Sequence, residues 1–211
     1  MSEITTILWD IGGVLLTNGW DRNSRVRAAA EFAMDWDDFE SRHQELEPLW
    51  DRGRITMREY LDRAIFHRPR TFSVKQMEDY IIDCSQPHPE TIEFAAEVFR
   101  SRSCLQVALN NEPLELNLRR IEKFDLKRCF TAFLSSCFLG EAKPDPAIYR
   151  KALMILQRSA SECLFIDDRP VNLESAGKAG MRTLLYTDLD QLRSSLRAEG
   201  FLPRATAESG I

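Results

Sequence analysis

The sequence predicts an α/β fold in which a doubly wound parallel sheet carries a small all-helical domain. Short apolar runs alternate with helical stretches in the later part of the chain, and one long helical stretch follows the first apolar run. The chain has 211 residues, of which 44% are hydrophobic and 29% charged. This is ordinary globular usage, and the length is sufficient for one large core and a small second domain.

Five short apolar runs, rich in part in β-branched residues, predict buried strands. They are residues 4–9, 105–109, 132–134, 163–166 and 182–186. Stretches with helical periodicity lie beside the later apolar runs, at residues 90–100, 113–124, 146–156, 171–179 and 189–199. Because strand and helix alternate there, we expect a parallel sheet covered on both faces by right-handed crossovers.

Residues 17–88 break this alternation. The stretch has no convincing buried strand, and its periodicity predicts helices at residues 25–34, 37–49, 56–65 and 73–84. The chain would leave the core around residues 16–19 and return at Pro87-His88-Pro89, because the residue before a proline disfavours the helical conformation. We therefore expect a core domain of residues 1–16 and 89–211, with residues 17–88 as a helical lid.

Composition argues against several classes of protein. The apolar runs are too short to cross a bilayer, and the N-terminus lacks the pattern of a signal peptide, so a cytoplasmic protein with no membrane contact is expected. The five cysteines are scattered without zinc-binding spacing, which favours reduced thiols. A net charge of −5 argues against nucleic acid, although residues 63–70 could form a local positive patch. The oligomeric state, monomer or homodimer, stays open.

Polar side chains follow the predicted strands at the edge where open α/β sheets bind their ligands, beyond the carboxyl ends of the strands. They are Asp10 after the first run, Asn110 and Asn111 after the second, Lys143 after the third, and Asp167 and Asp168 after the fourth. Carboxylates brought together repel one another unless a hard cation lies between them, and oxygen ligands suit Mg²⁺. The set predicts a site where metal and lysine hold a phosphate while a carboxylate attacks it.

Gly12 and Gly13 follow Asp10 directly, so the backbone can turn sharply there and approach a metal or phosphoryl oxygen. Most of these polar residues also have a purely structural interpretation. Asp10 could be a turn residue, Lys143 a solvated loop lysine, and one of the two later aspartates a helix cap. Asn111 could bind phosphate or only shape its turn.

Four segments in order resemble the motifs of the haloacid dehalogenase superfamily. Residues 7–15, ILWDIGGVL, resemble the first motif, and residues 107–111, VALNN, occupy the place of the second. Residues 140–149, GEAKPDPAIY, resemble the third, and residues 164–168, LFIDD, resemble the fourth, followed by Asn172, Ala176 and Gly180-Met181. Residues 49–56, LWDRGRIT, resemble a helix-turn-helix stretch of the helical caps in this superfamily.

The resemblance implies a Rossmann-like core, a cap inserted after the first motif, and an Mg²⁺-dependent phosphatase acting on a small phosphorylated substrate. Asp10 would form an aspartyl-phosphate, and Lys143 would steady both Asp10 and the phosphoryl group. Mg²⁺ would be bound by Asp10, the Gly12 carbonyl and Asp168, with Asp167 a direct or water-mediated partner. Phosphate contacts would come from Asn110, Asn111, Lys143 and Gly13. By analogy with the family, sugar phosphates are the leading substrate candidate.

Two positions depart from the pattern. Phosphatases of the superfamily usually have a second aspartate two residues after the nucleophile as general acid and base, and here that residue is Gly12. The second motif usually has Ser or Thr, and here it has Asn110, whose amide can still donate a hydrogen bond. These departures keep two alternatives open: a metal-independent dehalogenase, and a catalytically weakened protein retained for phosphate binding or regulation.

Overall fold

The computed structural model describes residues 3–101 and 104–201. Within these residues, five parallel strands form one sheet in the order β3-β2-β1-β4-β5. The strands are β1 (Thr6–Trp9), β2 (Leu105–Ala108), β3 (Ala132–Phe133), β4 (Cys163–Asp167) and β5 (Arg182–Leu185). Each predicted strand is confirmed, and so is the doubly wound parallel topology.

The register of the central strands places three strand ends at one level. Trp9, near the end of β1, lies beside Ala108 of β2 on one side and Ile166 of β4 on the other. Because the strands are parallel, the residues that follow these positions emerge at the same edge of the sheet. This edge is where the candidate site residues were expected.

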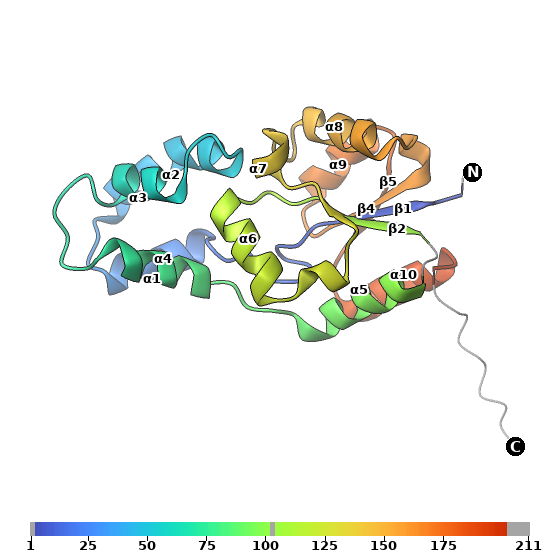
Figure 1. Cartoon of the computed structure of the whole chain (residues 1–211), viewed down its shortest axis with the longest axis horizontal. Coiled ribbons are helices and arrows are strands. Elements are labelled where there is room, and N and C mark those ends of the chain that lie inside the picture. The colour runs from blue at the N-terminus through green and yellow to red at the C-terminus, as the bar shows by residue number, and fades with distance from the viewer. Residues whose placement is uncertain (1–2, 102–103, 202–211) are drawn as a thin grey trace, which may run out of the picture.

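Helices cover both faces of the sheet (Figure 1). Ile7 and Trp9 of β1 pack with α5 (Pro89–Ser101) and α10 (Leu189–Ala198) on one face. Leu8 points the other way and packs with α8 (Pro146–Leu156) and α9 (Pro170–Lys178). This alternation is the period-two pattern of a strand buried on both sides. The other core elements are α6 (Leu114–Lys123), α7 (Ser136–Leu139) and two 3₁₀ turns, Leu126–Arg128 and Ala160–Glu162.

Residues 22–83 form helices α1 (Arg22–Glu31), α2 (Trp36–Asp51), α3 (Met57–Ala64) and α4 (Val74–Asp83), which lie beyond the carboxyl ends of the strands (Figure 1). Each begins after a side chain that accepts a hydrogen bond from a backbone N–H of its first turn; these caps are Asp21, Asp35, Thr56 and Ser73. Their apolar faces pack into a hydrophobic cluster separate from those of the sheet. The helical nature predicted for this stretch is confirmed.

The outbound and return crossings lie side by side. The backbone N–H of Thr17 donates to the carbonyl of Gln86 at 2.8 Å, and that of His88 donates to Leu15 at 2.8 Å. The Thr17 hydroxyl also accepts from the Gln86 N–H at 3.0 Å. The chain therefore crosses between the sheet and the helices where the sequence predicted. The division into domains at residues 17 and 88 stays a prediction.

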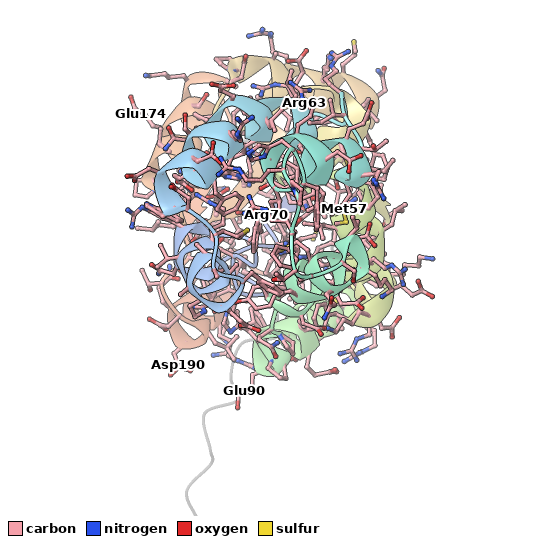
Figure 2. The ribbon with its side chains drawn as sticks, turned by 90° about the vertical axis from the view of Figure 1, so that its left-hand side faces the viewer. Met57, Arg63, Arg70, Glu90, Glu174 and Asp190 are labelled. Atoms are coloured by element: carbon pink, nitrogen blue, oxygen red, sulfur yellow. The ribbon has the colours of Figure 1, made fainter. Side chains whose placement is uncertain are left out.

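The basic stretch 63–70 lies at the outer end of the helical segment, and Arg63 and Arg70 both appear in the end-on view (Figure 2). Its charge is partly neutralised, since Arg68 contacts the Asp38 carboxylate at 2.6 Å. Arg70 donates to the Ile65 carbonyl at 2.8 Å. Among the described residues, no helix combines the length and the apolar character needed to cross a membrane.

Candidate active site

Asp10 stands at the carboxyl end of the central strand, and its place is set by backbone bonds. Its N–H donates to the Ile166 carbonyl at 2.8 Å, which continues the pairing of β1 with β4. One carboxylate oxygen, Oδ1, accepts the N–H of Ile11 at 2.8 Å. The chain then folds into a tight turn in which Leu15 and Leu16 both donate to the Ile11 carbonyl. Asp10 is therefore a buried, fixed carboxylate.

Lys143 reaches this carboxylate from the loop before α8. Its Nζ lies 2.8 Å from Asp10 Oδ1 and 2.7 Å from Asp167 Oδ2, and the side chain is buried. The interpretation of Lys143 as a solvated loop lysine is wrong for this reason.

Asn111 holds the Lys143 backbone by two bonds of 2.8 Å, because its amide oxygen accepts the Lys143 N–H and its amide nitrogen donates to the Lys143 carbonyl. The sequence left Asn111 open between phosphate binding and turn shaping. In the structure it anchors the lysine loop.

Asp167 is fully buried and heavily hydrogen bonded. Besides Lys143, its carboxylate accepts the Arg169 N–H at 2.8 Å and the Asn172 side-chain amide at 3.0 Å from each oxygen. Asp167 therefore positions Lys143, and Asn172 orients Asp167.

Asp168 lies beside this pair with an incomplete set of partners. Its Oδ1 is buried and accepts no hydrogen bond from any described residue. Helix α9 begins after Arg169 without a side-chain cap, so Asp168 does not cap that helix. Gly13, at φ +75°, leaves room for the Asp168 carboxylate, since a Cβ at Gly13 would overlap with it. A buried carboxylate oxygen without a donor is costly, and a cation is its natural partner.

The pKa values reflect the crowding of negative charge. Burial raises the pKa of Asp10, and Lys143 offsets only part of that effect. Burial and the neighbouring Asp167 raise the pKa of Asp168 as well. Burial works to lower the pKa of Lys143, but the carboxylates of Asp10 and Asp167 outweigh it, so that pKa is raised and the lysine is charged at neutral pH. One ammonium thus faces three carboxylates.

These carboxylates have the arrangement of a hard-metal site. Asp10, Asp167 and Asp168 each offer an oxygen, and these atoms lie within 4.8 Å of one another. Oxygen ligands, surplus negative charge and the unpartnered Asp168 oxygen together fit Mg²⁺.

Two residues that were predicted to contact phosphate, Asn110 and Gly13, are already hydrogen bonded within the protein. Asn110 is buried, with its Oδ1 2.8 Å from the Ser135 hydroxyl and its Nδ2 donating to Asn117 at 3.2 Å. The Gly13 N–H donates to the Leu16 carbonyl at 2.7 Å, inside the turn. Both groups are engaged within the protein, and their contact with phosphate stays a prediction.

A cavity of about 380 Å³ opens over Asp10, between the sheet edge and the helical segment. From the core it is lined by Asp10, Gly12, Asn111, Lys143, Arg169 and Asn172. The helical segment and its approach contribute Asn18, Trp20, Arg25, His43, Trp50 and Asp51, among others, and the region after β2 contributes Glu112, Leu116 and Arg120. The Asp10 carboxylate thus lies at the wall of a small cavity lined mostly by polar residues.

Several of these lining residues were missed by sequence reasoning. Glu112 and Arg120 form a buried ion pair, and Arg25 makes a two-point contact with Glu40 at 2.9 and 3.0 Å. Glu112 and Arg120 are eight residues apart in the sequence, and Arg25 and Glu40 are fifteen residues apart. Such separations carry no local pattern, so only the packed structure reveals the pairs. Asn18, on the outbound crossing, gave no signal either.

Aromatic residues of the helical segment pack against one another in its hydrophobic cluster. Tyr60 stacks on Trp50 at a centroid distance of 4.0 Å and accepts a hydrogen bond from the Trp20 indole at 2.9 Å. Its hydroxyl also lies 2.9 Å from His43 Nδ1. Trp20, Trp50 and His43 nevertheless form part of the cavity wall.

Solved structures of other proteins have the same fold as this chain. A HAD family enzyme from Bacteroides thetaiotaomicron superposes with a TM-score of 0.80 at 20% identity, over 91% of this chain and 99% of the other. A second structure of that enzyme, in complex with magnesium and inorganic phosphate, superposes with a TM-score of 0.73 at 20% identity, over 90% and 98% of the two chains.

Two curated proteins are similar in sequence over shorter stretches. Flavin mononucleotide hydrolase 1 of Arabidopsis thaliana is 34% identical over 89 residues, which are 42% of this chain and 36% of that protein. Phosphoglycolate phosphatase of Aquifex aeolicus is 27% identical over 101 residues, 48% of this chain and 47% of that protein. This chain thus spans less than half the length of either relative. The model of the haloacid dehalogenase-like hydrolases matches residues 4–180. The chain therefore belongs to the haloacid dehalogenase-like hydrolase family.

Proposed function

We propose that this chain is an Mg²⁺-dependent phosphatase that transfers the phosphoryl group of a small phosphorylated metabolite to Asp10 and then to water. The observation that carries the proposal is the buried contact of Lys143 with Asp10, on the floor of the cavity, beside the unpartnered oxygen of Asp168. Relatives named as a flavin mononucleotide hydrolase and a phosphoglycolate phosphatase support it. So does the similar Bacteroides enzyme, whose structure was determined with magnesium and phosphate.

Asp10 is suited to nucleophilic attack because one oxygen is held and the other is free to react. Oδ1 is bound by the Ile11 N–H and by Lys143, which leaves Oδ2 to attack phosphorus and form the aspartyl-phosphate. Lys143 is charged and pre-positioned by Asp167 and Asn111, so it can stabilise negative charge on the phosphoryl oxygens without moving.

Mg²⁺ would be held by Asp10, the Gly12 carbonyl and Asp168, with Asp167 as a direct or water-mediated partner. When bound, it would offset the charge of the phosphate and bring substrate and nucleophile together. The hydrogen bonds that already engage Asp167 favour the water-mediated role for that residue.

The helical segment would act as a cap over the site. The adjacent crossings at residues 15–17 and 86–88 form a narrow connection about which it can move. Closure would exclude water during transfer, and opening would admit water and release product. The cavity suits a compact substrate, and sugar phosphates remain the leading candidate by family analogy. A cytoplasmic location is proposed from the sequence alone.

A metal-independent dehalogenase fits the site less well. Such an enzyme would keep Asp10, Asp167 and Asp168 close together, with Lys143 as the one ammonium in contact with them among the described residues. Repulsion among the three carboxylates would then be compensated only in part. The geometry therefore favours chemistry in which a cation shares the site.

The test is a screen of phosphorylated metabolites with and without Mg²⁺, on wild type and Asp10→Asn. We expect turnover only with Mg²⁺, and a loss of at least about 10³-fold in Asp10→Asn, because an amide cannot attack phosphorus. Asp190→Asn, an exposed change on α10, is the control and should behave as wild type. Full activity in Asp10→Asn would disprove the assignment of the nucleophile.

A further inference from the structure

Asn18 fills the space that a side chain at position 12 would occupy. A Cβ built on Gly12 would lie 3.0 Å from Asn18 Oδ1, its nearest neighbour outside the turn. Gly12 does not have a left-handed φ, so the backbone itself would accept another residue there. What limits a larger residue at position 12 is therefore the Asn18 side chain.

The position of Asn18 is fixed by its neighbours. Thr17 is bonded to the return crossing through its backbone N–H and its hydroxyl. Gly19, at φ +66°, lies against the Arg120 guanidinium, with which a Cβ would overlap. Trp20 is anchored by its indole bond to Tyr60. The backbone on both sides of Asn18 is thus held in place, and the residue is presented to the cavity.

The Asn18 amide has no partner in the part of the chain that the structure describes. No hydrogen bond joins it to residues 3–101 or 104–201, and its side chain is exposed at the cavity wall. An asparagine amide donates hydrogen bonds through Nδ2 but cannot give up a proton near neutral pH. The Asn18 amide, whose Oδ1 would lie 3.0 Å from a Cβ at Gly12 and whose Nδ2 is a donor without a partner among the described residues, therefore borders the place where the resemblance leads one to expect a carboxylic acid.

We propose that Asn18 takes over the contact with the leaving-group oxygen, as a hydrogen-bond donor that stabilises the departing oxygen without protonating it. This inference rests on the proposed phosphatase function. In the first step, the bond between Asp10 oxygen and phosphorus forms while the bond between phosphorus and the leaving-group oxygen breaks. The leaving group keeps that electron pair, accepts the Asn18 N–H, and takes its proton from solvent.

In the second step, a water oxygen bonds to phosphorus, the Asp10–phosphorus bond breaks, and the water proton passes to solvent, which regenerates the carboxylate and yields phosphate. Because no acid assists departure, good leaving groups are favoured. The substrate class is then acyl phosphates, aryl phosphates and sugar 1-phosphates, ahead of simple alkyl phosphates.

The experiment measures kcat/KM for a series of aryl and alkyl phosphates of graded leaving-group pKa, with Mg²⁺, on wild type, Asn18→Ala and Asn18→Asp. Asn23→Asp is the matched control, since it adds the same charge at an exposed position that does not line the cavity. The readout is the ratio of alkyl to aryl turnover, because general effects of charge on binding cancel in this ratio. Melting temperatures verify that each variant is folded.

We expect a steep dependence on leaving-group pKa in wild type. Asn18→Ala should lower aryl turnover about 10-fold, the worth of one hydrogen bond. Asn18→Asp should raise the alkyl-to-aryl ratio about 10²-fold by supplying an acid. Gly12→Asp alone should raise the alkyl-to-aryl ratio only slightly, because the Asn18 side chain occupies the space beside it. In combination with Asn18→Ala, which frees that space, it should raise the ratio more.

Three results would overturn the assignment. An unchanged ratio in Asn18→Asp together with wild-type rates in Asn18→Ala would remove Asn18 from the reaction while leaving the phosphatase function intact. A shallow dependence in wild type that becomes steep in Asp51→Asn would assign proton donation to Asp51. Absence of turnover of every phosphate by wild type would overturn both this inference and the proposed function.

Discussion

At the scale of single residues, Lys143 matters both for folding and for the proposed chemistry. Its ammonium is buried between Asp10 and Asp167, and neither carboxylate has another cation at contact distance in the described chain. A buried charge network of this kind adds little net stability, but removing one member leaves the others unpaired. The lysine therefore stabilises the sheet edge, and in the proposed reaction it would also support the reactivity of Asp10.

Lys143→Ala should consequently reduce both activity and stability. We expect turnover to fall by about 10²- to 10³-fold and the free energy of unfolding to fall by about 3 kcal/mol. Mg²⁺ should restore part of the melting temperature, because it neutralises the same carboxylates, but should leave turnover low. A loss of activity of only twofold in the presence of Mg²⁺ would return Lys143 to a structural role.

Asp51, at the end of α2, makes stability depend on pH. Burial, with added repulsion from Glu47 and Glu112, raises the pKa of its carboxyl to about 8. Because this folded-state pKa lies above the unfolded value of 3.8, the folded protein holds the proton more tightly. The contribution of Asp51 to stability is thus full below about pH 4 and is lost as pH rises toward 8.

Asp51→Asn should remove this dependence. We expect the variant to be more stable than wild type at pH 8, on the order of 1–2 kcal/mol, and to lose that advantage at pH 4–5. Denaturant titrations across this range measure the effect. Asp37→Asn, an exposed change on the same helix, should keep the wild-type profile. A constant difference between Asp51→Asn and wild type at all pH values would contradict the argument.

At the scale of elements, the C-terminal end of α2 contacts the short helix α7. The Ser136 hydroxyl donates to the Asp51 carbonyl at 2.6 Å and accepts the Glu112 N–H at 2.8 Å, so one residue joins the helical segment to the loop after β2. Gly53 follows at φ +65°, and a Cβ there would lie 2.7 Å from the Cys137 carbonyl oxygen. The helical segment and the sheet edge meet closely at this turn.

Gly53→Ala should push these elements apart. Backbone strain and the clash with Cys137 together should lower the free energy of unfolding by about 2–3 kcal/mol. They should also raise KM if the helical segment closes over the site as proposed. Gly200→Ala is the matched control: its φ is +88°, but nothing lies within 4 Å of a Cβ there. It should show strain alone, about 1 kcal/mol, with KM unchanged. Equal effects of the two substitutions on stability and KM would exclude a close contact.

At the scale of the whole molecule, metal binding and folding should be coupled through the carboxylates at the sheet edge. A ligand that binds only the folded state stabilises it by about 2.7 kcal/mol at a hundred times its Kd. For a chain of this size the melting temperature should rise by about 5–10 °C with Mg²⁺. Calorimetry with Mg²⁺ and with a chelator measures this shift.

Asp168→Asn should change the melting temperature without metal and the response of the melting temperature to Mg²⁺ in opposite directions. It should raise the melting temperature without metal, because it removes one charge from a crowded, buried cluster, and it should abolish the shift caused by Mg²⁺. Asp190→Asn should leave both values as in wild type. A full Mg²⁺ shift in Asp168→Asn would mean that the metal binds elsewhere.

The sequence by itself determined the elements of this fold and the edge of the sheet that carries the site. Apolar runs such as residues 105–109 and 163–166 correspond to strands, and capping side chains such as Thr56 and Ser73 mark helix starts, because these signals are local. The parallel direction of the strands then brings Asp10, Lys143 and the aspartate pair together. The four-residue helix α7 was not predicted, since it is too short to show periodicity.

Only the tertiary structure decided what each polar group touches. Asn111 clamps Lys143, Glu112 pairs with Arg120, and Asn18 fills the space beside Gly12. These contacts join segments separated along the chain, and they depend on side-chain direction and on the volume left by neighbouring atoms. A local sequence pattern reports which residues are buried or helical, but the pairing of buried polar groups is set when the elements pack and each group must find a partner.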